Sequence, residues 1–230
     1  MGDLTRATDE ELQRIYNDIP SFYDRANALI SFFQDVKWRT ELVATVRSYV
    51  PKPRSVLDVA SGKGELSFIV KKLMDKDTIM LDYALNMLKS SFVEGERVLA
   101  SFYNLPFRDG AFDAVVSSFA LHAADDIEEV VREMARVSRG VIGVIAMGKD
   151  DNPILRSYVG IYLRFIQPYL AKLVGAKPED YRYIYYIYRR IPVNSQVKKT
   201  FEKYVELKLF EVKALGSVYI CVGTKRDLGR

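Results

Sequence analysis

Short apolar runs alternate with amphipathic stretches over most of the chain. The runs have the length of β-strands, and the stretches between them carry apolar residues at the spacing of one helix face. The runs that predict strands are residues 55–60, 78–81, 98–101, 112–118, 141–147, 205–214 and 217–224. The stretches that predict helices are residues 9–18, 38–49, 66–74, 125–138 and 195–204. We therefore expect an α/β fold with a Rossmann-like, mostly parallel, seven-stranded sheet that has helices on both faces.

Three local features refine this architecture. The last two strands are joined at Gly216 and predict an antiparallel pair at the C-terminal end. In the fourth predicted helix, Asp125 and Asp126 suit the positive end of the helix dipole, and Gly140 is expected as the C-cap. Residues 150–192 interrupt the alternation with two apolar, aromatic-rich helical stretches, which predict a helical cap insertion.

Length and composition are those of one globular domain. A chain of 230 residues, of which 49% are apolar and 28% are charged, can bury a single core. We expect one domain over residues 1–230, with an N-terminal helical lid at about 1–50 and the insertion at about 150–192.

Charge and cysteine content exclude several classes of protein. The 34 Lys and Arg residues exceed the 30 Asp and Glu residues only slightly and are spread along the chain, so we expect no nucleic-acid partner. The single cysteine, Cys221, permits no intramolecular disulfide and agrees with a cytoplasmic location. No uncharged apolar run approaches the ~20 residues needed to cross a bilayer, and the N-terminus has no apolar signal segment.

The clearest chemical motif follows the first predicted strand. Ala60, Gly62 and Gly64 are small residues in the loop VASGKGE at 59–65. Small residues let a backbone turn pass close to a ligand at the carboxyl end of a strand, where open α/β sheets bind. About 20 residues later Asp82 ends the second strand, where an acidic side chain accepts hydrogen bonds from ribose hydroxyls. Together these features predict a nucleoside cofactor.

Two residues favour S-adenosylmethionine over a dinucleotide. The third glycine of a dinucleotide-binding loop is replaced here by Ser67. Asp58, which precedes the glycines, suits the ammonium group of a methionine moiety, a group that NAD lacks. We therefore expect an S-adenosylmethionine-dependent methyltransferase and not an oxidoreductase.

Further motifs extend along the chain. They are SFYDRAN at 21–27, KWR at 37–39, the glycine loop, Asp82 with NML at 86–88, LPF at 105–107, FD at 112–113, SFAL at 118–121 and DYRY at 180–183. With these motifs the chain resembles the ubiquinone/menaquinone biosynthesis C-methyltransferases over nearly its whole length. Many methyltransferases share the glycine loop and LPF, so the N-terminal motif and DYRY are the more specific ones.

The resemblance implies S-adenosylmethionine as cofactor and assigns parts of its site. Tyr23 and Asn27 would form a lid, Asp82 would hold the ribose, and Ser101 and Phe102 would flank the adenine. The positions implied in cofactor binding are Tyr23, Asn27, Asp58, Ala60, Ser61, Gly62, Lys63, Gly64, Asp82, Tyr83, Met87, Ser101, Phe102 and Ser118. The acceptor that the resemblance implies is a small, hydrophobic molecule, a prenylated quinol precursor.

Two departures from the family pattern concern function. Ser101 stands where the family has Asn or Asp, which alters the contact to the adenine amino group. His122 and Ala123 stand where the family has Arg-Asn, a pair implied to activate the acceptor.

His122 is the only histidine of the chain. Methyl transfer requires no metal, because the sulfonium is a good leaving group, but the acceptor must be positioned and must lose a proton. An imidazole with a pKa near ~6.5 suits that step at neutral pH, so we expect His122 to act as general base. A histidine that caps the helix at Asp125 is the alternative.

The tyrosine-rich stretch at 179–191 allows two interpretations. Its tyrosines could pack a core with their hydroxyls at the rim, or they could line a hydrophobic acceptor that has a polar head. Tyr181 and Tyr183 match the family and are the next catalytic candidates. The apolar side chains of the insertion stand among arginines, which suits either peripheral contact with a membrane or a homodimer contact.

Three functions agree with these patterns. The first is C-methylation of a prenylated quinol precursor, and the second is methylation of another small acceptor by the same fold. The third is a non-catalytic protein that keeps only the cofactor site.

Overall fold

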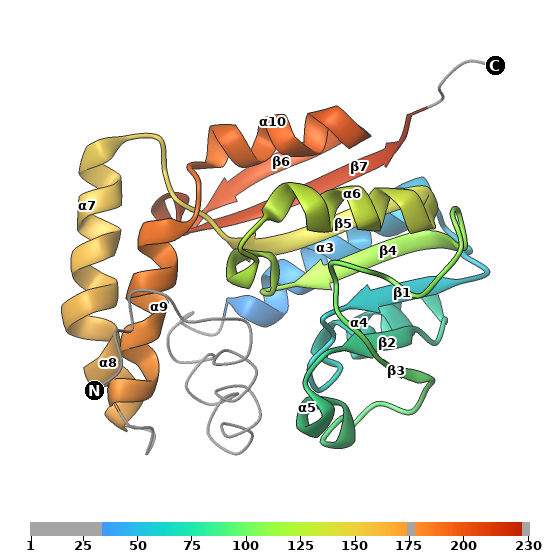
Figure 1. Cartoon of the computed structure of the whole chain (residues 1–230), viewed down its shortest axis with the longest axis horizontal. Helices are drawn as coiled ribbons and strands as arrows, with labels where there is room; N and C mark the ends of the chain where they lie inside the picture. Colours follow the sequence, from blue (N-terminus) through green and yellow to red (C-terminus); the bar gives the residue numbers. More distant parts are fainter. Residues whose placement is uncertain (1–33, 174–177, 227–230) are drawn as a thin grey trace.

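Seven strands of the described residues form one sheet through the middle of the molecule (Figure 1). The computed structural model describes residues 34–173 and 178–226. In spatial order the strands are β3 (Arg97–Leu99), β2 (Ile79–Asp82), β1 (Val56–Val59), β4 (Phe112–Ser118), β5 (Ser138–Met147), β7 (Val218–Lys225) and β6 (Val205–Lys213). The first five run parallel, and β7 pairs antiparallel with both β5 and β6. The predicted sheet and its antiparallel C-terminal pair are confirmed.

Amphipathic helices cover both faces of this sheet. On one face lie α6 (Ile127–Val137) and α10 (Asn194–Tyr204), and on the other lie α3 (Asp35–Tyr49) and α4 (Glu65–Met74). Each of these helices buries its apolar stripe against the strands. All four residues of β1 are buried as a result, which is why its sequence is apolar almost throughout. The short helix α5 (Leu85–Lys89) follows β2.

A separate group of helices stands beside the carboxyl ends of the parallel strands, whose arrows point toward it in Figure 1. It contains α7, a π-helical turn, α8 and α9, and we call it the cap. Their bounds are Pro153–Ile161, Tyr162–Ile166, Gln167–Leu173 and Pro178–Arg190. The cap has a small apolar core of its own, to which Val159, Leu163 and Ile187 belong. The helical insertion is therefore observed between β5 and α10.

The ends of α6 agree only in part with the prediction. Asp126 caps the N-terminus, where its Oδ1 accepts hydrogen bonds from the backbone N–H groups of Glu128 (2.9 Å) and Glu129 (3.2 Å). The prediction of Gly140 as the C-cap is wrong, because the chain passes from α6 directly into β5 and Gly140 lies in that strand. A Cβ at Gly140 would lie 2.3 Å from the carbonyl oxygen of Asp113. The glycine therefore serves the close approach of β4 and β5.

A second glycine of β5 sets the position of α3. A Cβ at Gly143 would lie 2.5 Å from Cγ2 of Val46 and 3.1 Å from Cδ1 of Leu42, so α3 rests on the bare backbone of this strand. Both contacting side chains are fully buried and have no room to move aside.

We predict that Gly143→Ala lowers the free energy of unfolding by about 1–3 kcal/mol, because the added methyl group overpacks the α3–β5 contact. Urea denaturation measures this change. Gly160→Ala in α7 is the matched control. Its Cβ would lie 3.9 Å from the nearest atoms, those of Tyr185 and Tyr188, so helix propensity should make that variant as stable as the wild type or up to about 1 kcal/mol more stable. Equal stability of the two variants would contradict the close packing of α3.

Candidate active site

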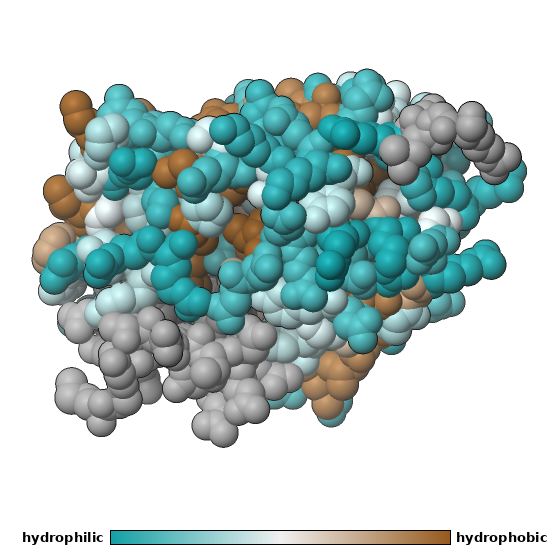
Figure 2. Space-filling model, turned by 45° about the horizontal axis from the view of Figure 1, so that its top comes forward, coloured by the Kyte–Doolittle hydropathy of each residue, from teal (hydrophilic) through white to brown (hydrophobic). Residues whose placement is uncertain are grey.

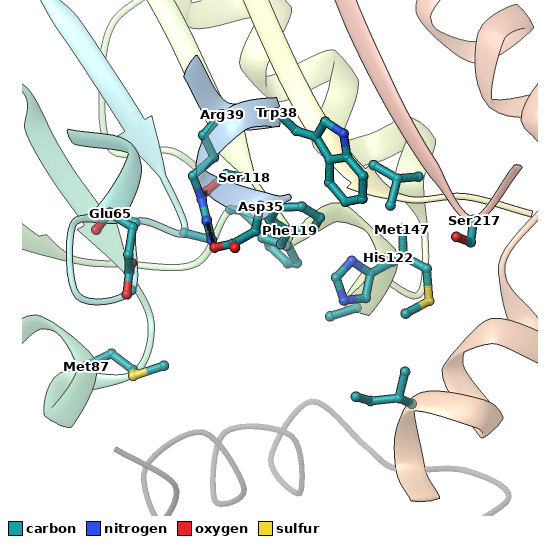
Figure 3. A pocket seen from close by; sticks show the side chains of 18 of the residues that line it. Asp35, Trp38, Arg39, Glu65, Met87, Ser118, Phe119, His122, Met147 and Ser217 are labelled. Carbon is teal, nitrogen blue, oxygen red and sulfur yellow. Dashed lines mark hydrogen bonds and ion pairs between the residues drawn. The ribbon is translucent and has the colours of Figure 1, made fainter. Parts of the chain in front are cut away.

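A cavity of about 690 Å³ opens where the parallel strands end and the cap begins. This volume is usual for a small-molecule site, and the carboxyl ends of the strands are where open α/β sheets bind ligands. Figure 3 shows Glu65 and Met87 at one side of the cavity and His122, Met147 and Ser217 at the other. The first side carries the predicted cofactor residues, and we call it the loop side. The second is formed with the cap, and we call it the cap lobe; His122, Met147, Val159, Leu163, Gln167 and Ile184 line it.

The glycine loop between β1 and α4 forms the floor of the loop side. Ala60, Gly62 and Gly64 all have positive φ values, of 53°, 57° and 95°. At Gly64 a side chain is excluded by space as well, since a Cβ would lie 2.9 Å from Cγ2 of Val93. The buried hydroxyl of Ser61, which also lines the cavity, has no hydrogen-bond partner among the described residues. The loop therefore presents backbone and an unpartnered hydroxyl to the cavity, as a cradle for a polar ligand would.

Asp82 lies at the end of β2 and holds this loop in place. Its carboxylate accepts a hydrogen bond from the N–H of Gly62 at 2.8 Å on one oxygen and from the N–H of Ala84 at 2.8 Å on the other. Burial raises the pKa of the Asp82 carboxyl, and these backbone hydrogen bonds act in the opposite direction. Each oxygen can accept a further hydrogen bond, so ribose hydroxyls could bind where the sequence predicts them.

Met87, Tyr83, Ser101 and Phe102 line the same side of the cavity. The hydroxyl of Ser101 accepts a hydrogen bond from the N–H of Tyr103 at 3.2 Å and so shapes the turn after β3. The ring of Phe102 meets that of Tyr103 edge to face, with 4.7 Å between the ring centroids. A sulfur, an aromatic ring and a short hydroxyl suit a flat heterocycle such as adenine.

Asp58 is not among the described residues that line the cavity. It is completely buried behind the glycine loop, where its Oδ2 accepts a hydrogen bond from the hydroxyl of Ser67 at 2.6 Å. Ser67 in turn accepts one from the hydroxyl of Thr78, also at 2.6 Å. Burial raises the pKa of Asp58 to about 7. Ser67, which replaces the third glycine of a dinucleotide-binding loop, thus donates a hydrogen bond to this buried acid, whose Oδ1 has no partner among the described residues.

The N-terminal turns of α3 contribute a group of residues for which the sequence suggested no role. Nε of Arg39 donates a hydrogen bond to the hydroxyl of Ser118 at 3.3 Å, and Nη1 forms an ion pair with Asp35 at 2.6 Å. The guanidinium also lies over the ring of Phe119, 4.9 Å from its centroid (Figure 3). The KWR motif at 37–39 is the sequence feature that could have indicated this role, because two of its residues, Trp38 and Arg39, line the cavity.

His122 lies in a short 3-10 turn after β4, and its imidazole points into the cap lobe next to Met147 (Figure 3). Its Nδ1 has no hydrogen-bond partner among the described residues. Burial lowers the pKa of His122 to about 4, because few water molecules remain to solvate an imidazolium. The expected titration near neutrality is therefore wrong, and the side chain is neutral at neutral pH. Asp126, and not His122, caps α6.

Four predicted residues cannot be placed in this way. Tyr23 and Asn27 lie outside the described residues, as do the side chains of Tyr181 and Tyr183 on α9. Their assignments stay predictions.

Fold and site together define a class of protein. A glycine turn after the first parallel strand, an acid after the second and an antiparallel C-terminal strand pair are the features of the Rossmann-like, S-adenosylmethionine-dependent methyltransferases. The model of the ubiE/COQ5 methyltransferase family matches residues 4–225, and the chain belongs to this family. The resemblance noted from the sequence motifs is confirmed.

Curated relatives agree with this assignment. A demethylmenaquinone methyltransferase of Roseiflexus castenholzii is 31% identical over 183 residues, which are 76% of either chain. One of Staphylococcus aureus is 26% identical over 208 residues, 86% of either chain. The chain is therefore a methyltransferase, and the non-catalytic alternative is not supported.

Solved structures show the same fold at low identity. An S-adenosylmethionine-dependent methyltransferase of Thermotoga maritima superposes with a TM-score of 0.64 at 16% identity, over 93% of this chain and 99% of that one. One of Aquifex aeolicus gives 0.54 at 12% identity, over 87% and 98%. The cofactor of this class is S-adenosylmethionine, and the Asp82 carboxylate, the Ser61 hydroxyl and the Met87 side chain fit its ribose, polar and apolar parts.

We predict that Asp82→Asn lowers the affinity for S-adenosylmethionine about 5- to 150-fold, equivalent to about 1–3 kcal/mol. An amide keeps the size of the side chain but offers one acceptor oxygen instead of two, so a ribose hydroxyl and a loop N–H lose a partner. Titration calorimetry measures the effect. Asp77→Asn, at an exposed carboxylate on the surface, is the control and should bind like the wild type. Unchanged affinity in Asp82→Asn, or tight binding of NAD by the wild type, would rule out the ribose assignment.

Proposed function

We propose that this chain transfers the methyl group of S-adenosylmethionine to a ring carbon of a prenylated quinol, as in the conversion of demethylmenaquinol. The cap lobe carries this proposal. Its wall combines apolar side chains of β5 and the cap with very few polar atoms, and it is continuous with the loop side. The names of the curated relatives support the same acceptor.

The cofactor, when bound, supplies an electrophilic methyl group on its sulfonium. The chain has to place the ring carbon in line with that methyl group and to make the carbon more nucleophilic. A ring carbon gains nucleophilicity when the neighbouring hydroxyl loses its proton. The carbon takes the methyl group as the bond from methyl to sulfur breaks, and its own proton then leaves to restore the aromatic ring. His122 lines the cap lobe, and its neutral imidazole has one nitrogen that can accept a proton. Its lowered pKa keeps the imidazole unprotonated at neutral pH and also makes it a weaker base than a free histidine. An imidazolium formed beside the acceptor oxygen would be stabilised by the negative charge that develops there.

We predict that His122→Ala lowers turnover of a short-chain prenyl naphthohydroquinone about 100- to 10,000-fold, the usual effect of losing a general base. The affinity for S-adenosylhomocysteine should change less than twofold, because His122 lies in the cap lobe. Product formation is followed by mass spectrometry under reducing conditions. Met147→Leu, a change of shape in the same lobe, is the control and should keep most of the turnover. Turnover of His122→Ala within a few-fold of wild type would exclude the base role.

The pH dependence provides a second readout of the same residue. Because the folded pKa lies at about 4, wild-type turnover should show no histidine step between pH 5.5 and 8. The folded pKa is below the unfolded value of ~6.5, so the unfolded chain binds more protons between these values and stability rises with pH across that window. This rise should be absent in His122→Ala. The single imidazole gives one set of NMR signals, and a midpoint near 6.5 would contradict the burial of His122.

An apolar stripe on the outside of the cap suggests where such an acceptor is collected. Figure 2 shows hydrophobic side chains along the outer edge over α7, among hydrophilic ones. The members of the stripe recur every three or four residues and are each more than half exposed: Ile154, Tyr158, Ile161, Phe165 and Tyr169. Tyr158 also lines the cavity, and Arg164 lies over the ring of Phe165 at 5.1 Å. None of the described helices is long and apolar enough to cross a membrane. We propose that the stripe contacts the surface of an anionic membrane.

We predict that Phe165→Glu weakens binding to vesicles of phosphatidylglycerol and phosphatidylcholine roughly tenfold at low salt, because it removes a buried ring from the interface and adds a repelled charge. Co-sedimentation measures the bound fraction. Phe92→Glu replaces an equally exposed phenylalanine outside the cap and should bind like the wild type. Wild-type protein that stays unbound but forms a dimer, which Phe165→Glu dissociates, would assign the stripe to a homodimer contact instead.

A further inference from the structure

A π-helical turn interrupts the long cap helix where it borders the cavity. It spans Tyr162–Ile166, and the N–H of Gln167 donates its hydrogen bond to the carbonyl of Tyr162, five residues back. A π-turn holds one residue more than an α-turn and shifts the residues after it around the helix axis. Ile166 is 48% exposed, whereas Gln167 is only 1% exposed. Isolated π-turns in helices are frequent at functional sites.

Gln167, directly after this turn, places a carboxamide on the buried face of the cap helix. Val159 and Leu163 precede Gln167 on this face, and all three line the cap lobe. The carbonyl Oε1 of Gln167 has no hydrogen-bond partner among the described residues. Buried polar atoms are nearly always hydrogen-bonded in proteins, so this carbonyl, which has no partner among the described residues, is a candidate to accept a hydrogen bond from a ligand of the cavity.

A second side chain with an unpartnered polar atom lines the same cavity. It is His122, whose buried Nδ1 has no hydrogen-bond partner among the described residues. The other side chains by which we defined the cap lobe are apolar, and Ser217, Tyr158 and Tyr162 also line the cavity. A ligand that satisfies it is a flat apolar molecule with hydroxyl groups on its ring.

We propose that Gln167 is a positioning residue, which accepts a hydrogen bond from a ring hydroxyl of the methyl acceptor. This hydrogen bond fixes how the ring lies in the cap lobe, and so which ring carbon faces the methyl group. The role rests on the proposed function insofar as the acceptor is a hydroxylated aromatic. Beyond the proposed function, this role identifies Gln167 as the side chain that distinguishes a hydroxylated ring from an apolar ring of equal size.

Two probes of nearly equal shape test the role of Gln167 directly. 2-Naphthol carries a ring hydroxyl, and 2-methoxynaphthalene has no proton to donate. Their affinities are measured by fluorescence titration of protein saturated with S-adenosylhomocysteine. Wild-type protein should prefer 2-naphthol about tenfold, and Gln167→Met should reduce this preference to less than twofold, since methionine fills the space without an acceptor oxygen. Gln167→Leu is a second variant in case one of them folds poorly.

A matched control separates hydrogen bonding from packing. Leu163→Met changes the same face of the lobe without adding or removing a polar group, so it should alter the affinities for both probes equally. The melting temperature of free Gln167→Met should equal or exceed that of wild type, because an unpartnered buried carbonyl is removed. A glutamine with a purely structural role would instead lower the melting temperature and leave the preference unchanged.

The outcomes keep this inference distinct from the proposed function. A preference that persists in Gln167→Met, or is absent from wild type, overturns the role of Gln167. A different result overturns only the proposed acceptor. In it, wild-type protein prefers 2-naphthol and Gln167→Met loses that preference, but wild-type protein does not methylate a prenyl naphthohydroquinone. With an active wild type, the KM of Gln167→Met for that acceptor should rise about tenfold while its affinity for S-adenosylhomocysteine stays within twofold.

Discussion

The carboxylate of Asp82 ties together the loops that follow β1 and β2. Parallel strands bring their carboxyl ends to one edge, so an acid at the end of β2 can bind the N–H of Gly62 across the gap and that of Ala84 on its own strand. Hydrogen bonds to a charged acceptor contribute about 1.5–3 kcal/mol each, which outweighs the ~1–2 kcal/mol that a left-handed Ala60 costs. The glycine loop therefore has its binding conformation before any cofactor arrives.

The opposite wall depends on packing and not on a buried charge. Gly143 lets α3 lie directly on β5, and this position carries Arg39 to Ser118 and Phe119 at the end of β4. One helix thus connects the core of the domain with the space between cofactor and acceptor. A shift of α3 would move Arg39 and Trp38 together, so packing far from the cavity determines its shape.

Periodicity and turn residues predicted most of the fold. The predicted and observed bounds of β4 coincide at 112–118, and the glycine loop with Asp82 could be placed because both motifs follow strands. Gly140 failed as a C-cap because glycine also marks close strand contacts, which spacing does not distinguish from a helix end. The pKa of His122 depends on burial by the cap, a contact between distant segments. Gln167 was missed because a single glutamine in an apolar helical stretch carries no motif, although its spacing from Val159 and Leu163 places it on their face of the helix.

Polar side-chain atoms without hydrogen-bond partners mark where ligands are expected to bind at the sheet and at the cap. On the loop side, Asp82 accepts hydrogen bonds from backbone N–H groups, and the hydroxyl of Ser61 has no partner among the described residues. In the cap lobe, Nδ1 of His122 and Oε1 of Gln167 have no hydrogen-bond partner among the described residues. Each orphaned group lowers the stability of the free protein by about 1–3 kcal/mol, and a ligand that supplies the missing donor recovers it. We therefore expect the cap, and not the glycine loop, to discriminate against an acceptor without hydroxyls.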